Sequence, residues 1–179
     1  MSPSLTDTLC THCALCCDGS LFADVELASS AESTGLEIIG LEVEDGDGDA
    51  GLLSLPCSAL RGRRCGIYAH RPECCRTFEC GLLQDVRSGA VSVQRAQEHI
   101  AEARSKIQRV NRLLTELGDR GERLPLKERC AEMIATAAPD ATPAEHRKRA
   151  ELEAEMAAVE RIIWTTFLGS GAEFEPAGR

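Results

Sequence analysis

Aromatic residues are scarce in this chain of 179 residues, where one Trp, one Tyr and four Phe make up 3% of the sequence. A hydrophobic core must therefore be built from Leu, Ile, Val, Ala and sulfur. Nowhere do about 18 apolar residues follow one another, so the sequence predicts no membrane-spanning helix. The first 30 residues contain no Lys or Arg and no long apolar run. A secretory signal peptide needs both features, so we expect a cytoplasmic protein.

Basic residues are also outnumbered, because 20 Lys and Arg stand against 29 Asp and Glu, which gives a formal net charge of −9. Nucleic acids and anionic membranes are bound by broad basic surfaces. We therefore expect neither a nucleic acid nor a membrane as a partner. The sequence contains no G-x-x-x-x-G-K-S/T loop, so no P-loop motif supports nucleotide binding.

Cysteine, in contrast, is abundant, with ten residues in the chain. Nine of them lie between Cys10 and Cys80, and only Cys130 lies further along. The cytosol keeps thiols reduced, so this density indicates metal binding rather than disulfides. The uneven placement predicts a cysteine-rich metal-binding domain over residues 1–88. Residues 89–179 are expected to form a helical hairpin with a loose C-terminal tail.

Short strands are expected in the cysteine-rich part. Residues 36–39 and 41–43 are rich in Leu, Ile and Val, and residues 52–55 are their expected pairing partner. Residues 45–49 alternate Asp with Gly, which is typical turn chemistry. The pattern predicts a β-hairpin.

Apolar residues recur every three or four positions from about Ser92 to Leu117, which predicts one long helix that ends at Gly118. A shorter helix is expected over residues 125–137. The apolar stripe of the long helix consists of Val93, Ala96, Ile100, Ala103, Ile107, Val110, Leu114 and Leu117.

A second long helix is expected to begin at Thr142, which is followed by Pro143 and Glu145 in the pattern of a capping box. It should run to about Phe167. Its apolar stripe consists of Leu152, Met156, Val159, Ile163 and Phe167. Matching stripes predict that the two long helices pack antiparallel. The alternative is that the stripe pairs two copies of the chain in a homo-oligomer.

The expected fold is thus mostly α. A small irregular cysteine-rich metal-binding module with a short β-hairpin is followed by a C-terminal helical hairpin. Within the module, Cys10, Cys13 and Cys16 follow one another with two-residue gaps, and Cys17 comes next. This spacing can direct several thiolates at one metal ion, as in zinc ribbons and ferredoxins.

A second set of cysteines follows further along the module, and together with the first set it supplies enough sulfur for two four-thiolate centres. The second set consists of Cys57, Cys65, Cys75 and Cys80, with Cys74 as an additional member. Neighbouring side chains tend to point apart. The adjacent pairs Cys16/Cys17 and Cys74/Cys75 are therefore expected to face different sites, or to leave one thiol outside them.

Arginines are concentrated around this second set. Between Cys57 and Cys80 the chain has five Arg against two Glu, a local excess of three positive charges. The arginines are Arg61, Arg63, Arg64, Arg71 and Arg76. Guanidinium groups near thiolates would lower the thiol pKa values and offset the negative charge of a metal–thiolate centre. The alternatives are an ordinary solvated surface or recognition of an anionic partner.

The cysteine pattern resembles the YkgJ-type cysteine cluster family, whose CxxCxxCC domain chelates zinc or iron. The matching residues are Cys10-x-x-Cys13-x-x-Cys16-Cys17, Cys57-x-x-Leu60, Cys65-x-Ile67-Tyr68, Arg71-Pro72-x-x-Cys75-Arg76 and Phe78-x-Cys80. The resemblance covers about Cys10 to Leu83. It implies eight metal-binding positions: Cys10, Cys13, Cys16, Cys17, Cys57, Cys65, Cys75 and Cys80. Cys74 and Cys130 lie outside the pattern.

From the resemblance we expect a protein that holds an iron–sulfur cluster, with 4Fe–4S favoured, zinc, or both. A redox or accessory role with an electron-transfer or other protein partner would follow. A similar cysteine cluster occurs in flagellin lysine methylases, so one alternative is a modifying enzyme supported by a cluster. The other alternative is a protein-interaction module stapled by zinc.

Overall fold

The computed structural model describes residues 4–46, 50–121, 123–136 and 141–169. The chain divides into two compact units, each described by itself. The helical unit comprises Met1–Cys13, Glu79–Asp119 and Cys130–Arg179, and the sheet unit comprises Ala14–Phe78 and Arg120–Arg129. Within the described residues, no helix combines the length and apolar character that a membrane span requires.

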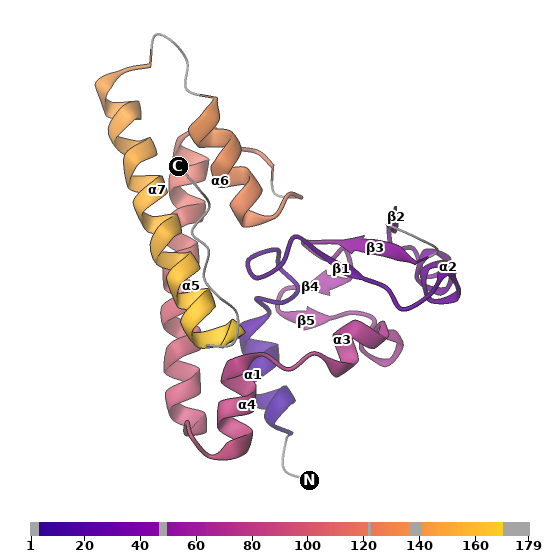
Figure 1. Cartoon of the computed structure of the whole chain (residues 1–179). Coiled ribbons are helices and arrows are strands. Elements are labelled where there is room, and N and C mark those ends of the chain that lie inside the picture. The colour runs from indigo at the N-terminus through magenta and orange to yellow at the C-terminus, as the bar shows by residue number, and fades with distance from the viewer. Residues whose placement is uncertain (1–3, 47–49, 122, 137–140, 170–179) are drawn as a thin grey trace. The chain divides into compact units, whose positions relative to one another are not determined.

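The helical unit is built around two long helices, α5 (Val93–Glu116) and α7 (Pro143–Ile162). They lie side by side in Figure 1. A π-helical turn, η2 (Ile163–Leu168), continues α7. Two short helices from the N-terminal half, α1 (Leu5–Cys13) and α4 (Gly81–Ser88), pack against α5. Helix α6 (Leu126–Ala135) begins in the sheet unit and continues into the helical unit.

Helix α5 confirms the predicted long helix. Ser92 caps it by accepting a hydrogen bond from the Arg95 N–H at 3.1 Å, and Gly118, with φ +91°, follows its end. The residues buried along α5 are Ala96, Ile100, Ala103, Ile107, Val110, Leu113 and Leu114. Val93 and Leu117, at the two ends of the predicted stripe, are only partly buried. The central part of the predicted stripe is therefore core.

Helix α7 likewise begins as predicted. Thr142 and Glu145 form a reciprocal capping box, and Pro143 stands in the first turn. All five residues of the predicted stripe are buried: Leu152, Met156, Val159, Ile163 and Phe167. The shorter predicted helix corresponds to α6, although residue 137, its expected end, lies outside the described residues.

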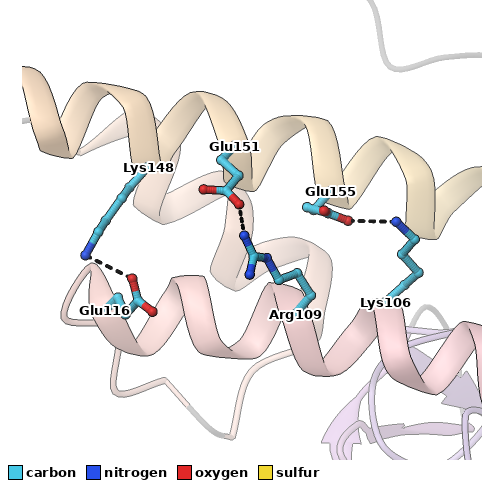
Figure 2. Close-up of polar contacts among 6 residues, drawn as sticks. All are labelled: Lys106, Arg109, Glu116, Lys148, Glu151 and Glu155. Atoms are coloured by element: carbon cyan, nitrogen blue, oxygen red, sulfur yellow. Dashed lines mark hydrogen bonds and ion pairs between the residues drawn. The ribbon is translucent and has the colours of Figure 1, made fainter.

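Ion pairs between α5 and α7 show the direction of packing (Figure 2). As residue numbers rise along α5, the numbers of the α7 partners fall, so the helices run antiparallel, as predicted. The pairs are Lys106–Glu155 at 3.2 Å, Arg109–Glu151, and Glu116–Lys148 at 2.9 Å.

The sheet unit contains two small antiparallel sheets. In the first, β3 (Gly51–Ser54) lies between β1 (Asp24–Glu26) and β2 (Glu44–Asp45). The second is the hairpin of β4 (Leu60–Arg61) and β5 (Arg64–Cys65). Three short helices complete the unit: α2 (Ser30–Ile38), η1 (Tyr68–His70) and α3 (Glu73–Thr77). One buried cluster in this unit consists of Leu27, Leu36, Leu41, Leu53 and Ala59.

The predicted hairpin is confirmed in part. Strands β2 and β3 pair antiparallel, but residues 36–39 and 41–43 are not strands. Residues 36–38 instead form the last turn of α2, which Ser29 caps by accepting a hydrogen bond from the Glu32 N–H. Of the apolar residues in this turn, only Leu36 belongs to the buried cluster. Residues 47–49 of the predicted turn lie outside the described residues.

Candidate metal centre

All ten cysteines lie in the described part of the chain, and the structure records them as thiols rather than disulfides. Four belong to the helical unit: Cys10, Cys13, Cys80 and Cys130. Six belong to the sheet unit: Cys16, Cys17, Cys57, Cys65, Cys74 and Cys75. The eight cysteines implied by the family resemblance are therefore shared between the units, with three in the first and five in the second.

The CxxCxxCC segment spans a helix end and the turn that follows. Cys10 and Cys13 lie three residues apart on α1 and therefore on one helix face. Ala14 then takes a left-handed conformation, with φ +61°. Its carbonyl accepts a hydrogen bond from the Cys17 N–H at 2.9 Å, which closes the turn that carries Cys16.

Cys57 brings the second set of cysteines to this turn. Its backbone N–H donates to the Cys17 carbonyl at 2.8 Å, across 40 positions of sequence. Burial raises the pKa of the Cys57 thiol, and the neighbouring Cys65 thiol acts in the same direction. The Cys65 thiol is thus close enough to influence the charge of Cys57.

Cys74 and Cys75 lie on α3, which two apolar contacts hold in place. Pro72, just before α3, is fully buried. Phe78, just after it, packs edge-to-face on Phe22 with ring centroids 5.2 Å apart. Because adjacent residues on a helix are turned by about 100° rather than 180°, the two thiols can meet, and the S–H of Cys75 bonds to the sulfur of Cys74.

The two side chains therefore contact each other although neighbouring side chains tend to point apart, and the contact separates their acidities; that they face different sites stays a prediction. The hydrogen bond with Cys75 lowers the pKa of Cys74 to about 7. The same bond raises the pKa of Cys75, as do burial and the nearby thiols of Cys17 and Cys57. The thiols of Cys17 and Cys57, from two other segments of the sheet unit, therefore lie close enough to Cys75 to raise its pKa.

Cys80 stands at the start of α4 in the helical unit. Burial raises the pKa of its thiol, whereas the backbone amides of Leu82 and Leu83 act to lower it. Amides at a helix N-terminus favour negative charge, so this position stabilises a thiolate once a cation is present to compensate for burial.

The arginines of the second set have distinct roles. The Nη1 of Arg61 donates to the carbonyls of Ser58 at 2.6 Å and Leu60 at 3.1 Å. Its charge acts to lower the Cys57 pKa, although burial has the larger effect. Arg71 lies over the Tyr68 ring, 3.8 Å from the centroid. Its Nη1 is 3.5 Å from the Cys75 carbonyl.

Glu32 is a residue of this region that the sequence analysis missed. One oxygen of its carboxylate accepts from the Glu73 N–H, at the start of α3, at 2.7 Å. The other accepts from the Ala28 N–H at 2.9 Å. Glu32 therefore ties the helix that carries Cys74 and Cys75 to α2. No local sequence signal links positions 41 residues apart.

The donor atoms fit zinc or iron in kind, because both metals favour thiolates. They also fit in number, since the sheet unit alone supplies more than four. Across residues 4–46, 50–121, 123–136 and 141–169, however, no three Cys, His, Asp or Glu side chains are arranged to hold an ion. The described residues thus supply donors of the right kind and number without placing three of them around one point.

Comparison with known proteins agrees with the cysteine pattern. Residues 9–94 match the CxxCxxCC family model, described as "Putative zinc- or iron-chelating domain". The matched stretch contains nine of the ten cysteines and ends at the start of α5. No curated protein and no solved structure matches the chain.

Proposed function

Because residues 9–94 belong to the CxxCxxCC family, we propose that this chain is a metal-binding protein whose cysteines hold an iron–sulfur cluster, zinc, or both. The observation that carries the proposal is the gathering of thiols in the sheet unit. There the Cys57 N–H bonds to the Cys17 carbonyl, and the thiols of both residues act on Cys75. Thiols from three segments of the sheet unit are thus near enough for their charges to influence Cys75.

The proposed ligands are Cys10, Cys13, Cys16, Cys17, Cys57, Cys65, Cys75 and Cys80. The five in the sheet unit are enough for one complete four-thiolate centre. A 4Fe–4S cluster is the preferred occupant, and it would supply electron transfer when bound. Zinc would supply folding energy instead. In either case the chain's own part is to present the thiols, with Arg61 offsetting charge at Cys57.

The test is elemental analysis of the full chain purified without oxygen, combined with an absorption spectrum. A cluster predicts iron with an equal amount of acid-labile sulfide, and a broad visible band that bleaches reversibly with dithionite. Two zinc ions with no sulfide and no colour would refute the cluster and leave the zinc form. A folded protein with neither metal, before and after reconstitution, would refute the whole proposal.

The adjacent residues of α3 offer a matched pair of variants. Cys75→Ser removes a proposed ligand, and we expect metal content to fall and the visible band to weaken. Cys74→Ser changes a residue on the same helix that lies outside the family pattern, so metal content should stay at the wild-type level. Equal metal content in both variants would remove Cys75 from the ligand set.

One observation also favours a second function, docking of an acidic protein partner beside the metal. Arg61 and Arg64 are directly opposed in the β4–β5 hairpin, with Arg63 in the turn, and all three are exposed. Like charges facing each other across a hairpin destabilise it, so binding of an anionic surface would relieve the repulsion. The double variant Arg63→Glu/Arg64→Glu should lose affinity for a decaglutamate peptide at low salt, whereas unchanged affinity would refute this docking site.

A further inference from the structure

Arg104 contacts the CxxCxxCC segment from outside the family domain. It lies on α5, ten residues beyond the end of the matched stretch. Its Nη1 donates a hydrogen bond to the backbone carbonyl of Cys13, the last residue of α1. Both residues belong to the helical unit. The contact therefore joins the C-terminal helical region to the first cysteine motif.

The position of Arg104 on α5 makes this contact a fixed one. Ala103, its neighbour in the chain, and Ile100 and Ile107, one turn away on either side, are all buried. Arg104 itself is half-buried. Its backbone and the base of its side chain are thus held by the packed face of the helix, so that the guanidinium is presented to α1 rather than left free to rotate in solvent.

The contact has two physical consequences for the motif. The last carbonyls of a helix have no partner within that helix, and Arg104 satisfies the one at Cys13. A guanidinium is also always charged, and a cation is favourable at a helix C-terminus. The chain leaves α1 directly afterwards through the left-handed Ala14, so Arg104 fixes the helix end from which Cys10 and Cys13 project.

We propose that Arg104 is a positioning residue for the metal: it holds the end of α1 so that Cys10 and Cys13 keep one face, and it places a permanent positive charge beside their thiolates. This inference rests on the proposed metal binding. Loss of a group that orients a metal ligand without itself touching the metal typically lowers metal affinity by about 10- to 100-fold. A loss of that size is the expected effect here.

The experiment compares metal release from the full-length, metal-loaded chain to a competing chelator. Arg104→Met keeps an unbranched apolar stem but removes the donors and the charge, so we expect metal affinity to fall by about 10- to 100-fold. Arg104→Lys keeps the charge and an N–H donor group on a shorter side chain, and should recover part of that loss. Arg95→Met is the control, because Arg95 lies on the same helix in an exposed ion pair with Glu98.

A second background, the Cys13→Ser variant, distinguishes a role of Arg104 at the metal from a merely structural role. In Cys13→Ser, one proposed ligand is already gone, so adding Arg104→Met should change metal release far less than it does in the wild type. An equal effect in both backgrounds would overturn the inference, as would wild-type affinity in both Arg104→Met and Arg104→Lys. If Arg104→Met does not fold, Arg104→Lys decides alone, and unchanged affinity there is the refuting result. Absence of metal from the wild type would instead refute the proposed function.

Discussion

Leu152 and Glu151 are adjacent on α7, and variants of the two residues compare how much apolar packing and ion pairs each stabilise the contact between α5 and α7. Leu152 is fully buried, with 0% of its surface exposed. Leu152→Ala removes a buried isopropyl group and leaves a cavity between tightly packed helices, which typically costs about 2–5 kcal/mol of stability. For a chain of this length, 1 kcal/mol lowers the melting temperature by about 2–4 °C, so we expect a drop of roughly 4–20 °C.

Glu151 is the matched comparison, because it precedes Leu152 and pairs with Arg109 on α5 (Figure 2). Its side chain is 41% exposed and that of Arg109 is 44% exposed. Water and salt screen such a pair, so Glu151→Ala should destabilise the protein far less than Leu152→Ala. Urea unfolding followed by far-UV circular dichroism measures both. Equal destabilisation by the two variants would refute the view that apolar packing, rather than the ion pairs, holds α5 against α7.

Three further predictions concern local structure. Thr142→Ala should lower stability by about 1 kcal/mol in urea unfolding, because it removes the cap of α7. The Thr142 amide also holds the pKa of Glu145 below its usual 4.5. The wild type should therefore be more stable than Glu145→Gln above pH 4.5, and this extra stability should disappear as the pH falls through the lowered pKa of Glu145. A difference in stability that persists in strong acid would contradict this. Ala14→Gly should raise stability by about 0.5–1 kcal/mol, because relief of the left-handed strain exceeds the entropy cost of glycine; a measured loss would count against strain at Ala14.

The long helices were predictable because their signals are local and repeated. The apolar spacing of α5 continues through seven turns, and its central members, such as Val110, are fully buried. The capping box at Thr142 acts through backbone groups only three residues away. Signals of this kind need no knowledge of the rest of the chain, and the structure follows them closely.

The strands were less predictable, because their apolar runs are short. Residues 36–39 have the composition of a strand, yet α2, which begins after its cap at Ser29, runs through residue 38. Ile38 is consequently 79% exposed. Strand β1 has three residues with one apolar side chain, Val25, which is too short to show any period. Tertiary pairing with β3 decides its conformation.

For the metal centre, the sequence identifies the donors but not their arrangement. The cysteine spacing predicted a resemblance to the CxxCxxCC family, and residues 9–94 match that family model. It could not show that the Cys57 amide meets the Cys17 carbonyl, that Glu32 holds the start of α3, or that Arg104 reaches Cys13. Each of these contacts joins distant segments. The eight-cysteine ligand set itself, and the domain boundary at residue 88, stay predictions.

The two units differ in what holds them together, and metal removal should expose this difference. The helical unit buries long apolar stripes on α5 and α7. One buried cluster of the sheet unit contains four Leu and one Ala, with Cys57 and Cys74 among the partly buried residues packed against it. A core in so small a unit rarely supplies more than about 3–5 kcal/mol, and small domains commonly add a metal as a staple.

If the proposed metal is that staple, a chelator should unfold the sheet unit while α5 and α7 stay folded. Hydrogen exchange followed residue by residue is the measurement, because it reports local unfolding. After chelation, amides in β3 (Gly51–Ser54) should lose protection, whereas amides around Val110 should keep it. The Arg95→Met variant should behave as the wild type does. Loss of protection throughout the chain would show that the helical unit depends on the metal too, and unchanged protection in β3 would show that the apolar core of the sheet unit suffices without it.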